Sequence, residues 1–114
     1  MKLSDLSVEE ILEKVEPIME NCLAGSNERN HEKHTKDFTD RMKAIVTPDE
    51  LKRQLASEPA VYFTQRDFVC LFRRSQSVGI VWKQSISSSD DELMNQAIFK
   101  EVDGKILIDH CIIC

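Results

Sequence analysis

A histidine and an aspartate three residues apart form the first candidate for chemistry. His34 and Asp37 share one face if their segment is helical. The carboxylate can then orient the imidazole as a base that removes a proton from a bound substrate. We therefore take His34 and Asp37 as candidate catalytic residues. The favoured alternative is an ordinary surface or half-buried helix pair, because the sequence fixes no third group beside them.

Aromatic residues of the second half supply a candidate ligand pocket. A cavity for an apolar or aromatic ligand could be lined by Tyr62, Phe63, Phe72 and Trp82, and a carboxylate of that ligand could be held by Arg66 or Arg73. We name Tyr62, Arg73 and Trp82 as candidate ligand-binding residues. The same aromatic residues occur in any small core, so structural packing is the alternative, which only a cavity would overturn.

A metal site and a redox pair are weaker alternatives. His31 and His34, together with Glu28 and Asp37, could ligate a metal that His110 completes. No tetrahedral set is visible, however, so we expect no metal and no cofactor. Cys111 and Cys114 have the spacing of a redox pair. On a strand, however, residues three apart point to opposite faces, so we predict structural thiols.

Three helices should precede the sheet. Ser7 and Glu10 form a capping box, and the apolar residues behind it recur at three- and four-residue steps, which predicts an amphipathic helix that Gly25 ends. A second helix is expected to begin at Asn30 and to carry apolar and aromatic residues along one side over positions 34–46. Thr47 and the proline after it predict a third, short helix.

After Pro59 the pattern changes to strands. Apolar and β-branched runs cover residues 61–63, 68–72, 78–82, 93–102 and 106–113. Short connections between them predict antiparallel neighbours, and Asp103-Gly104 is typical of a tight hairpin. The fold class is therefore α+β, with N-terminal helices packed on a curved antiparallel sheet, in one domain spanning residues 1–114.

Both faces of this sheet carry large apolar groups, whereas three modest helices can cover only one face. We therefore expect a homodimer in which the sheets of two copies pack face to face.

Composition narrows the class of protein. The 114 residues are 41% hydrophobic and 31% charged, as in an ordinary globular domain, and the net charge of −5 disfavours nucleic acid as a partner. Acidic residues interrupt the first residues, and no apolar run reaches the ~20 residues of a membrane span. We expect a cytoplasmic protein without a membrane partner, with reduced cysteines.

Three stretches, His34–Lys43, Thr47–Leu51 and Ile98–Ile106, stand in the helix-then-sheet order described above. This pattern resembles the NTF2-like (cystatin-like cone) superfamily, which includes small bacterial proteins of unknown function. It implies a conical cavity between the helices and the sheet, which in some members is a ligand pocket or an active site with Asp or His groups.

The sequence supports two hypotheses about function. The first is a homodimeric domain that binds a small apolar ligand, or a protein partner, in or beside the cone. The alternative is a small isomerase or dehydratase in which His34 or Asp37 is the base and Arg73 or Tyr62 steadies the oxyanion. The fold by itself does not choose between them.

Overall fold

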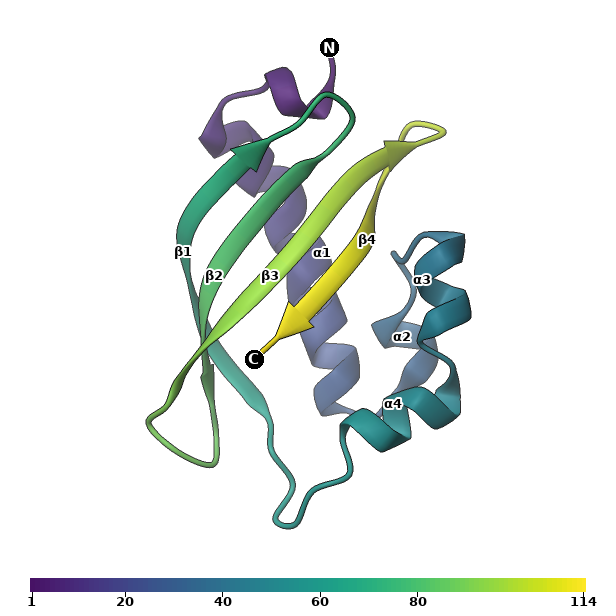
Figure 1. The fold of residues 1–114 in the computed structure, drawn as a ribbon, viewed down its shortest axis with the longest axis vertical. Helices are drawn as coiled ribbons and strands as arrows, with labels where there is room; N and C mark the ends of the chain where they lie inside the picture. Colours follow the sequence, from purple (N-terminus) through teal and green to yellow (C-terminus); the bar gives the residue numbers. More distant parts are fainter.

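The computed structural model describes residues 1–114, and its helices pack on a curved four-stranded antiparallel sheet, which confirms the predicted α+β class (Figure 1). None of the helices combines the length and the apolar character that a membrane-spanning helix requires. The elements are the 3-10 helix η1 (Leu3–Asp5), α1 (Val8–Asn27), α2 (His31–His34), α3 (Asp40–Ile45), α4 (Pro48–Gln54), β1 (Phe63–Arg73), β2 (Val78–Ile86), β3 (Glu92–Val102) and β4 (Lys105–Ile113).

Helix α1 begins as predicted and ends later than predicted. The Ser7 hydroxyl accepts from the Glu10 amide and the Glu10 carboxylate accepts from the Ser7 amide, both at 3.1 Å. The prediction that Gly25 ends the helix was wrong, because α1 continues to Asn27. A Cβ at Gly25 would lie 2.4 Å from the backbone nitrogen of His34. The glycine is therefore required by the close approach of α2, not by a turn.

The predicted second helix is two helices, α2 and α3, separated by a turn and a single β-bridge at Phe38. Backbone hydrogen bonds pair this segment with β4: the Ile108 amide donates to the Asp37 carbonyl at 2.7 Å, and the Thr39 amide donates to the Ile108 carbonyl at 3.0 Å. The Thr39 side chain then accepts from the Met42 amide and caps α3. Pairing with the sheet edge thus overrides the helical pattern over residues 35–39.

The start of α4 follows the sequence prediction. The Thr47 hydroxyl accepts from the Glu50 amide at 3.2 Å, and Pro48 occupies the first helical position. A backbone amide at that position makes no hydrogen bond within the helix, so the proline there costs none.

The sheet is a meander in the order β1-β2-β3-β4. The predicted hairpin at Asp103-Gly104 is confirmed, with φ of 51° and 80° at the two residues, which a two-residue turn of this type requires. The two apolar runs at 61–63 and 68–72 fall largely on one strand, β1, which carries irregularities in its pairing with β2. A further irregularity in β4 keeps Ile108 and Cys111 on the same side of the sheet.

The two faces of the sheet differ in their cover. Helix α1 lies behind the sheet in the view of Figure 1 and covers what we call the inner face, whose central side chains are fully buried. No helix covers the opposite, outer face, which is turned toward the viewer. Buried side chains of the inner face include Val78, Ile80, Trp82, Ala97, Phe99 and Ile108.

Candidate functional site

A pocket of about 420 Å³ lies between the C-terminal end of α1, the three short helices and the ends of β1 and β4. Its size falls within the ~300–1,000 Å³ range of small-molecule sites. Hydrophobic residues make up 11 of the 15 that line it. The lining comprises Cys22, Leu23, Ser26, His34, Phe38, Met42, Val46, Leu51, Arg53, Gln54, Leu55, Phe63, Cys111, Ile112 and Ile113.

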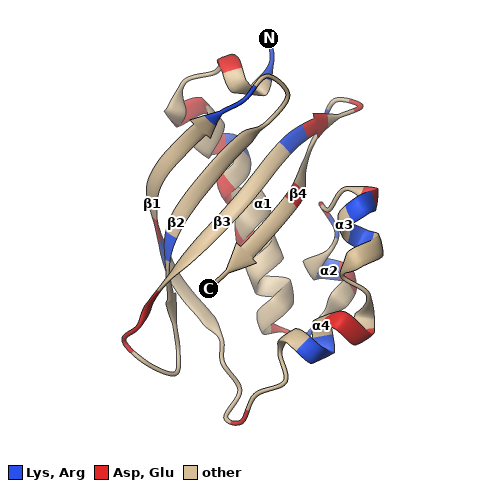
Figure 2. Ribbon diagram, viewed as in Figure 1, with Lys and Arg blue, Asp and Glu red and all other residues tan.

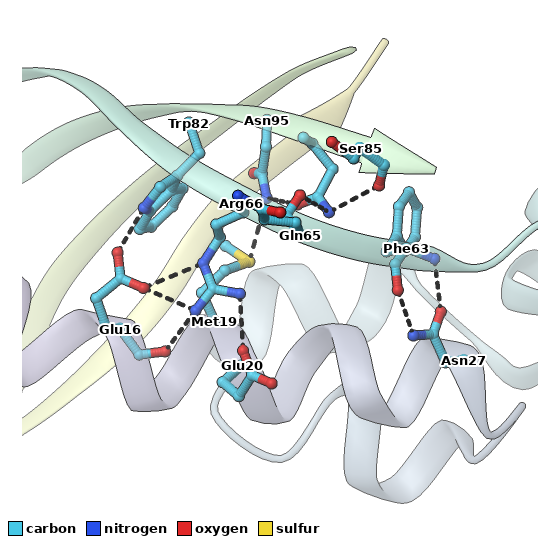
Figure 3. Close-up of polar contacts among 11 residues, drawn as sticks. Glu16, Met19, Glu20, Asn27, Phe63, Gln65, Arg66, Trp82, Ser85 and Asn95 are labelled. Carbon is cyan, nitrogen blue, oxygen red and sulfur yellow. Dashed lines mark hydrogen bonds and ion pairs between the residues drawn. The ribbon is translucent and has the colours of Figure 1, made fainter. Parts of the chain in front are cut away.

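Two local contacts hold the pocket open beside α1. Asn27, the last residue of α1, donates to the Phe63 carbonyl at 2.8 Å and accepts from the Phe63 amide at 2.9 Å, which fixes the start of β1 (Figure 3). On the other side, Gly25 lets α2 approach closely and so brings His34 against α1. The short helices α2–α4 then group beside α1 and β4 (Figure 1).

His34 is oriented by a backbone carbonyl of α1. Its Nδ1 lies 2.8 Å from the Cys22 carbonyl oxygen, which can only accept, so Nδ1 carries the proton and donates. The ring also packs edge-on against Phe38, with 5.2 Å between the ring centroids. Nε2 is consequently the unprotonated nitrogen and a hydrogen-bond acceptor.

Two polar atoms of the lining have no partner within the chain. The hydrogen bonds of the His34 ring involve Nδ1 and leave Nε2 free, and the Ser26 hydroxyl likewise makes none. Since no fully buried side-chain nitrogen or oxygen lacks a partner, neither atom is fully buried, and both belong to residues that line the pocket. Ser26 is nevertheless only 2% exposed overall.

Burial keeps the His34 imidazole neutral. Desolvation is the main cause that lowers the pKa of His34, the charge of His31 lowers it further, and the hydrogen bond to the Cys22 carbonyl partly opposes both. The ring therefore offers a lone pair, not a positive charge, at neutral pH.

The two thiols of the pocket are poor nucleophiles. Burial raises the pKa of Cys111 to about 12 and raises the pKa of Cys22 well above its ordinary value. Cys22 Sγ lies 3.5 Å from His34 Nδ1, but that nitrogen carries a proton and cannot remove one from the thiol. A Cys-His nucleophilic pair is not formed.

A paired charge lies at the edge of the pocket. The Arg53 side chain is 73% exposed and donates to the Glu50 carboxylate at 2.9 and 2.5 Å. Hydrogen bonds from Arg53, and then from Gln54, lower the pKa of Glu50 to about 2. The guanidinium therefore has its counterion in place, and no carboxylate lines the pocket.

The candidate catalytic pair is separated in the structure. His34 lines the pocket, whereas Asp37 does not, and no hydrogen bond joins their side chains. The Asp37 carbonyl instead pairs with the Ile108 amide of β4. The imidazole is oriented by the Cys22 carbonyl in the place of the expected carboxylate.

Two of the three candidate ligand-binding residues have structural contacts away from the pocket. Tyr62 is 42% exposed and stacks under the Arg29 guanidinium, 4.5 Å from its ring centroid. Arg73 donates to the carbonyl oxygens of Ser4 and Leu6 at 2.7 and 2.6 Å, and so holds η1 against β1.

The third, Trp82, fills the core beneath α1. It is fully buried, and its Nε1 donates to Glu16 at 2.6 Å (Figure 3). Arg66 binds the same carboxylate at 2.7 Å and Glu20 at 2.9 Å, with its guanidinium 5.6 Å from the Trp82 ring centroid. We call Glu16, Glu20, Arg66 and Trp82 the clamp. It ties α1 to β1 and β2 and leaves no room for a ligand at Trp82.

The metal-ligand and redox candidates have other roles in the structure. His31 Nε2 donates to the Val46 carbonyl at 2.7 Å, so this nitrogen is occupied, and no three His, Cys, Asp or Glu side chains cluster in a way that suits a metal ion. All four cysteines are free; Cys111 lines the pocket, whereas Cys114 is exposed.

No protein-family model matches the sequence, and comparison with curated proteins gives no match either. The site therefore rests on geometry. Sequence reasoning found His34 and Phe63 but missed Cys22, Ser26 and Cys111 as lining residues. The adjacent small residues Gly25 and Ser26 near the end of the amphipathic stripe were the available signal, since a helix narrows there.

Proposed function

We propose that the chain is an NTF2-like domain that binds a small apolar molecule in the pocket beside His34. The observation that supports this most is the pocket itself, about 420 Å³ in volume and lined mainly by hydrophobic residues. The order of helices followed by a curved sheet, with the pocket between them, supports the NTF2-like assignment.

Binding is better supported than catalysis. The isomerase or dehydratase hypothesis used His34 or Asp37 as the base and Arg73 or Tyr62 for the oxyanion, and of these four residues only His34 lines the pocket. A pocket lined mainly by hydrophobic residues suits a molecule that is held, because proton transfer would also need a group that stabilises the developing charge.

A fluorescent apolar molecule tests the binding proposal. N-phenyl-1-naphthylamine should bind the protein with increased emission, and Ile113→Phe, which fills the pocket, should weaken binding about tenfold or more. Val69→Phe is the matched control, because Val69 is also an aliphatic strand residue but is 57% exposed and outside the lining.

The two variants separate a pocket from a sticky surface. Equal binding to Ile113→Phe and Val69→Phe would place the dye elsewhere and would overturn the proposal. Absence of any binding by the unmodified protein would overturn it as well. Both variants should keep the far-ultraviolet circular dichroism of the parent protein, which shows that they fold.

We also propose that two copies associate through their outer faces. Phe72, Met94 and Ile112 are 54%, 51% and 48% exposed on this face, around the less exposed Val81 and Ile98. Figure 2 shows that most of β2 and β3 is free of charged residues, with charges near the strand ends. An apolar centre with a charged rim is typical of protein interfaces.

The outer face is also large enough for a dimer. Its strands have 9 to 11 residues. At ~3.3 Å per residue and ~4.8 Å between strands, the face measures about 600 Å². Two copies would then bury about 1,200 Å², the lower end of the range for stable interfaces.

A charge placed at the centre of this face tests the dimer. The protein should sediment as a dimer at micromolar concentration, and Ile98→Glu should sediment as a monomer. Ile45→Glu on α3, 53% exposed and not part of the outer face, should leave the dimer intact. A monomeric parent protein, or a dimer that survives Ile98→Glu, would contradict the proposal.

A cytoplasmic location is proposed with the same function, and the four free cysteines support it because reducing compartments keep thiols unpaired. Cell fractionation followed by immunoblotting tests it; recovery in an oxidising compartment would contradict it.

A further inference from the structure

Two unpartnered polar atoms of the lining determine which polar group a ligand of the pocket should carry. His34 Nε2 can only accept a hydrogen bond, because Nδ1 holds the proton and donates it to the Cys22 carbonyl at 2.8 Å. The Ser26 hydroxyl, also on the lining and without a partner, can both donate and accept. Every other lining residue inside the pocket is apolar or a thiol, apart from the polar pair Arg53 and Gln54 at the edge.

These two atoms are a poor hydrogen-bonding match for an anionic group. A carboxylate brings acceptors only, and the unprotonated Nε2 would face it with another acceptor. The guanidinium of Arg53 is held by Glu50 at 2.9 and 2.5 Å. Burial of an ion without a counter-charge costs much more than burial of a neutral polar group that is hydrogen-bonded.

A neutral hydroxyl matches both atoms. Its hydrogen can be donated to Nε2, and its oxygen can accept from a hydroxyl such as that of Ser26. An apolar molecule without any donor would leave Nε2 desolvated and without a partner when it fills the pocket, and this carries a penalty.

We infer that the ligand of this pocket is a neutral apolar alcohol or phenol, whose hydroxyl donates to His34 Nε2, and not a fatty or aromatic acid. The inference rests on the proposed function, since it requires that the pocket binds a small molecule. The lowered pKa of His34 agrees with it, because a neutral ring keeps the accepting lone pair.

Three compounds with the same ring system test the inference. 1-Naphthol, naphthalene and 1-naphthoate differ only in carrying a hydroxyl, no polar group or a carboxylate. Each is titrated against the protein loaded with N-phenyl-1-naphthylamine at neutral pH. Naphthol should bind about tenfold more tightly than naphthalene, as one buried hydrogen bond predicts. Naphthoate should bind more weakly than either.

Two substitutions of the histidine isolate the accepting atom. His34→Asn can keep a donor near the Cys22 carbonyl but has nothing at the place of Nε2, so the preference for naphthol over naphthalene should fall from about tenfold to near one. His34→Gln extends a polar amide toward the place of Nε2 and should keep part of the preference. Ser26→Ala should lower it by less than His34→Asn.

The outcomes distinguish the two proposals. If none of the three compounds displaces the dye, the proposed pocket function fails. If the compounds bind but naphthalene equals naphthol, or naphthoate is the tightest, the function stands and the hydroxyl inference is overturned. A preference for naphthol that persists unchanged in His34→Asn would also overturn it, because the donor would then be recognised elsewhere.

Discussion

The two halves of α1 pack on the molecule in opposite ways. At its middle, Glu16 meets Arg66 and the fully buried Trp82, and the space under the helix is filled (Figure 3). Two turns later, at Cys22 and Ser26, the helix borders a pocket of about 420 Å³. The same amphipathic stripe thus supports a closed core at one point and a hollow at the next.

The difference is chemical as well as steric. Near the clamp even deeply buried amides are satisfied: Asn95 donates to Gln84 at 3.3 Å, and Gln84 donates to the Gln65 carbonyl at 3.2 Å. In the pocket the Ser26 hydroxyl and His34 Nε2 remain open. Polar groups that have partners within the chain stabilise a fold, whereas groups left open at the edge of an apolar cavity can recognise a ligand.

The largest expected effect concerns the pocket thiols. The pKa of Cys111 is raised to about 12 from the ordinary 9.0, so its thiolate fraction near neutral pH should be about a thousandfold lower than for an unhindered thiol. Alkylation by iodoacetamide, followed by peptide mass spectrometry, should label the exposed Cys114 long before Cys22 or Cys111.

A bound ligand should increase the difference in alkylation rate between the pocket cysteines and Cys114. N-phenyl-1-naphthylamine should slow the labelling of Cys22 and Cys111 further and should leave Cys114 unchanged. Equal rates at all four cysteines would mean that the pocket half opens freely in solution, and the contrast between the two halves of α1 would then disappear.

Substitution of Gly25 should disrupt the packing of α2 against the C-terminal half of α1 and leave the clamp intact. In Gly25→Ala the new Cβ would lie 2.4 Å from the His34 backbone nitrogen, and a backbone contact cannot rotate away, so we expect a loss of about 3 kcal/mol in the free energy of unfolding. Urea denaturation measures it.

Gly79→Ala is the matched control for Gly25→Ala. Its Cβ would make an ordinary contact of 3.5 Å with the Phe72 side chain, so its stability should stay within about 1 kcal/mol of the parent protein. Similar losses in the two variants would show that the close approach of α2 is not what Gly25 provides.

The clamp should respond to loss of its arginine. Arg66 is 8% exposed and binds two carboxylates, of which Glu16 also accepts from Trp82. Arg66→Met should cost about 2 kcal/mol, because charged hydrogen bonds are lost, although the partly exposed carboxylates recover some hydration. Arg53→Met, in a pair whose arginine is 73% exposed, should leave the stability nearly unchanged, because solvent screens that pair. Comparable losses in the two variants would contradict the assignment of the clamp as the closed half.

Local signals predicted much of the fold. The capping box at Ser7, the Thr47-Pro48 start and the Asp103-Gly104 hairpin depend on neighbouring residues, and each is confirmed. The failures lie where distant segments meet. Gly25 was mistaken for a helix end because the close approach of α2 is a tertiary contact. The break at residues 35–39 arises from pairing with β4, about seventy residues later in the chain.

The site was only partly predictable for the same reason. His34 was chosen for its spacing to Asp37, yet its true partner is the backbone carbonyl of Cys22, which any residue type could supply. Trp82 and Arg73 were chosen as ligand-binding types, but their buried or structural partners, Glu16 and the carbonyls of η1, lie more than sixty residues away. Residue type indicates what a side chain can do, and only packing decides which atoms stay open.

The smallest expected effect is a change in the pH dependence of stability at His34. Its pKa is lowered in the folded state, mainly by burial, so the unfolded chain binds more protons as pH falls below about 6.5. The contribution of the neutral ring is therefore complete above pH 6.5 and is lost as pH falls toward the folded pKa. His31, Cys22 and Asp37 lie near enough to influence this region, so the comparison is made with His34→Asn, which keeps all three. Between pH 7.5 and 5, the parent protein should lose more stability than the variant in urea denaturation, because only the parent has a buried imidazole to protonate. Parallel curves would show that the imidazole is not desolvated, and the pocket half would then be as open to water as the surface.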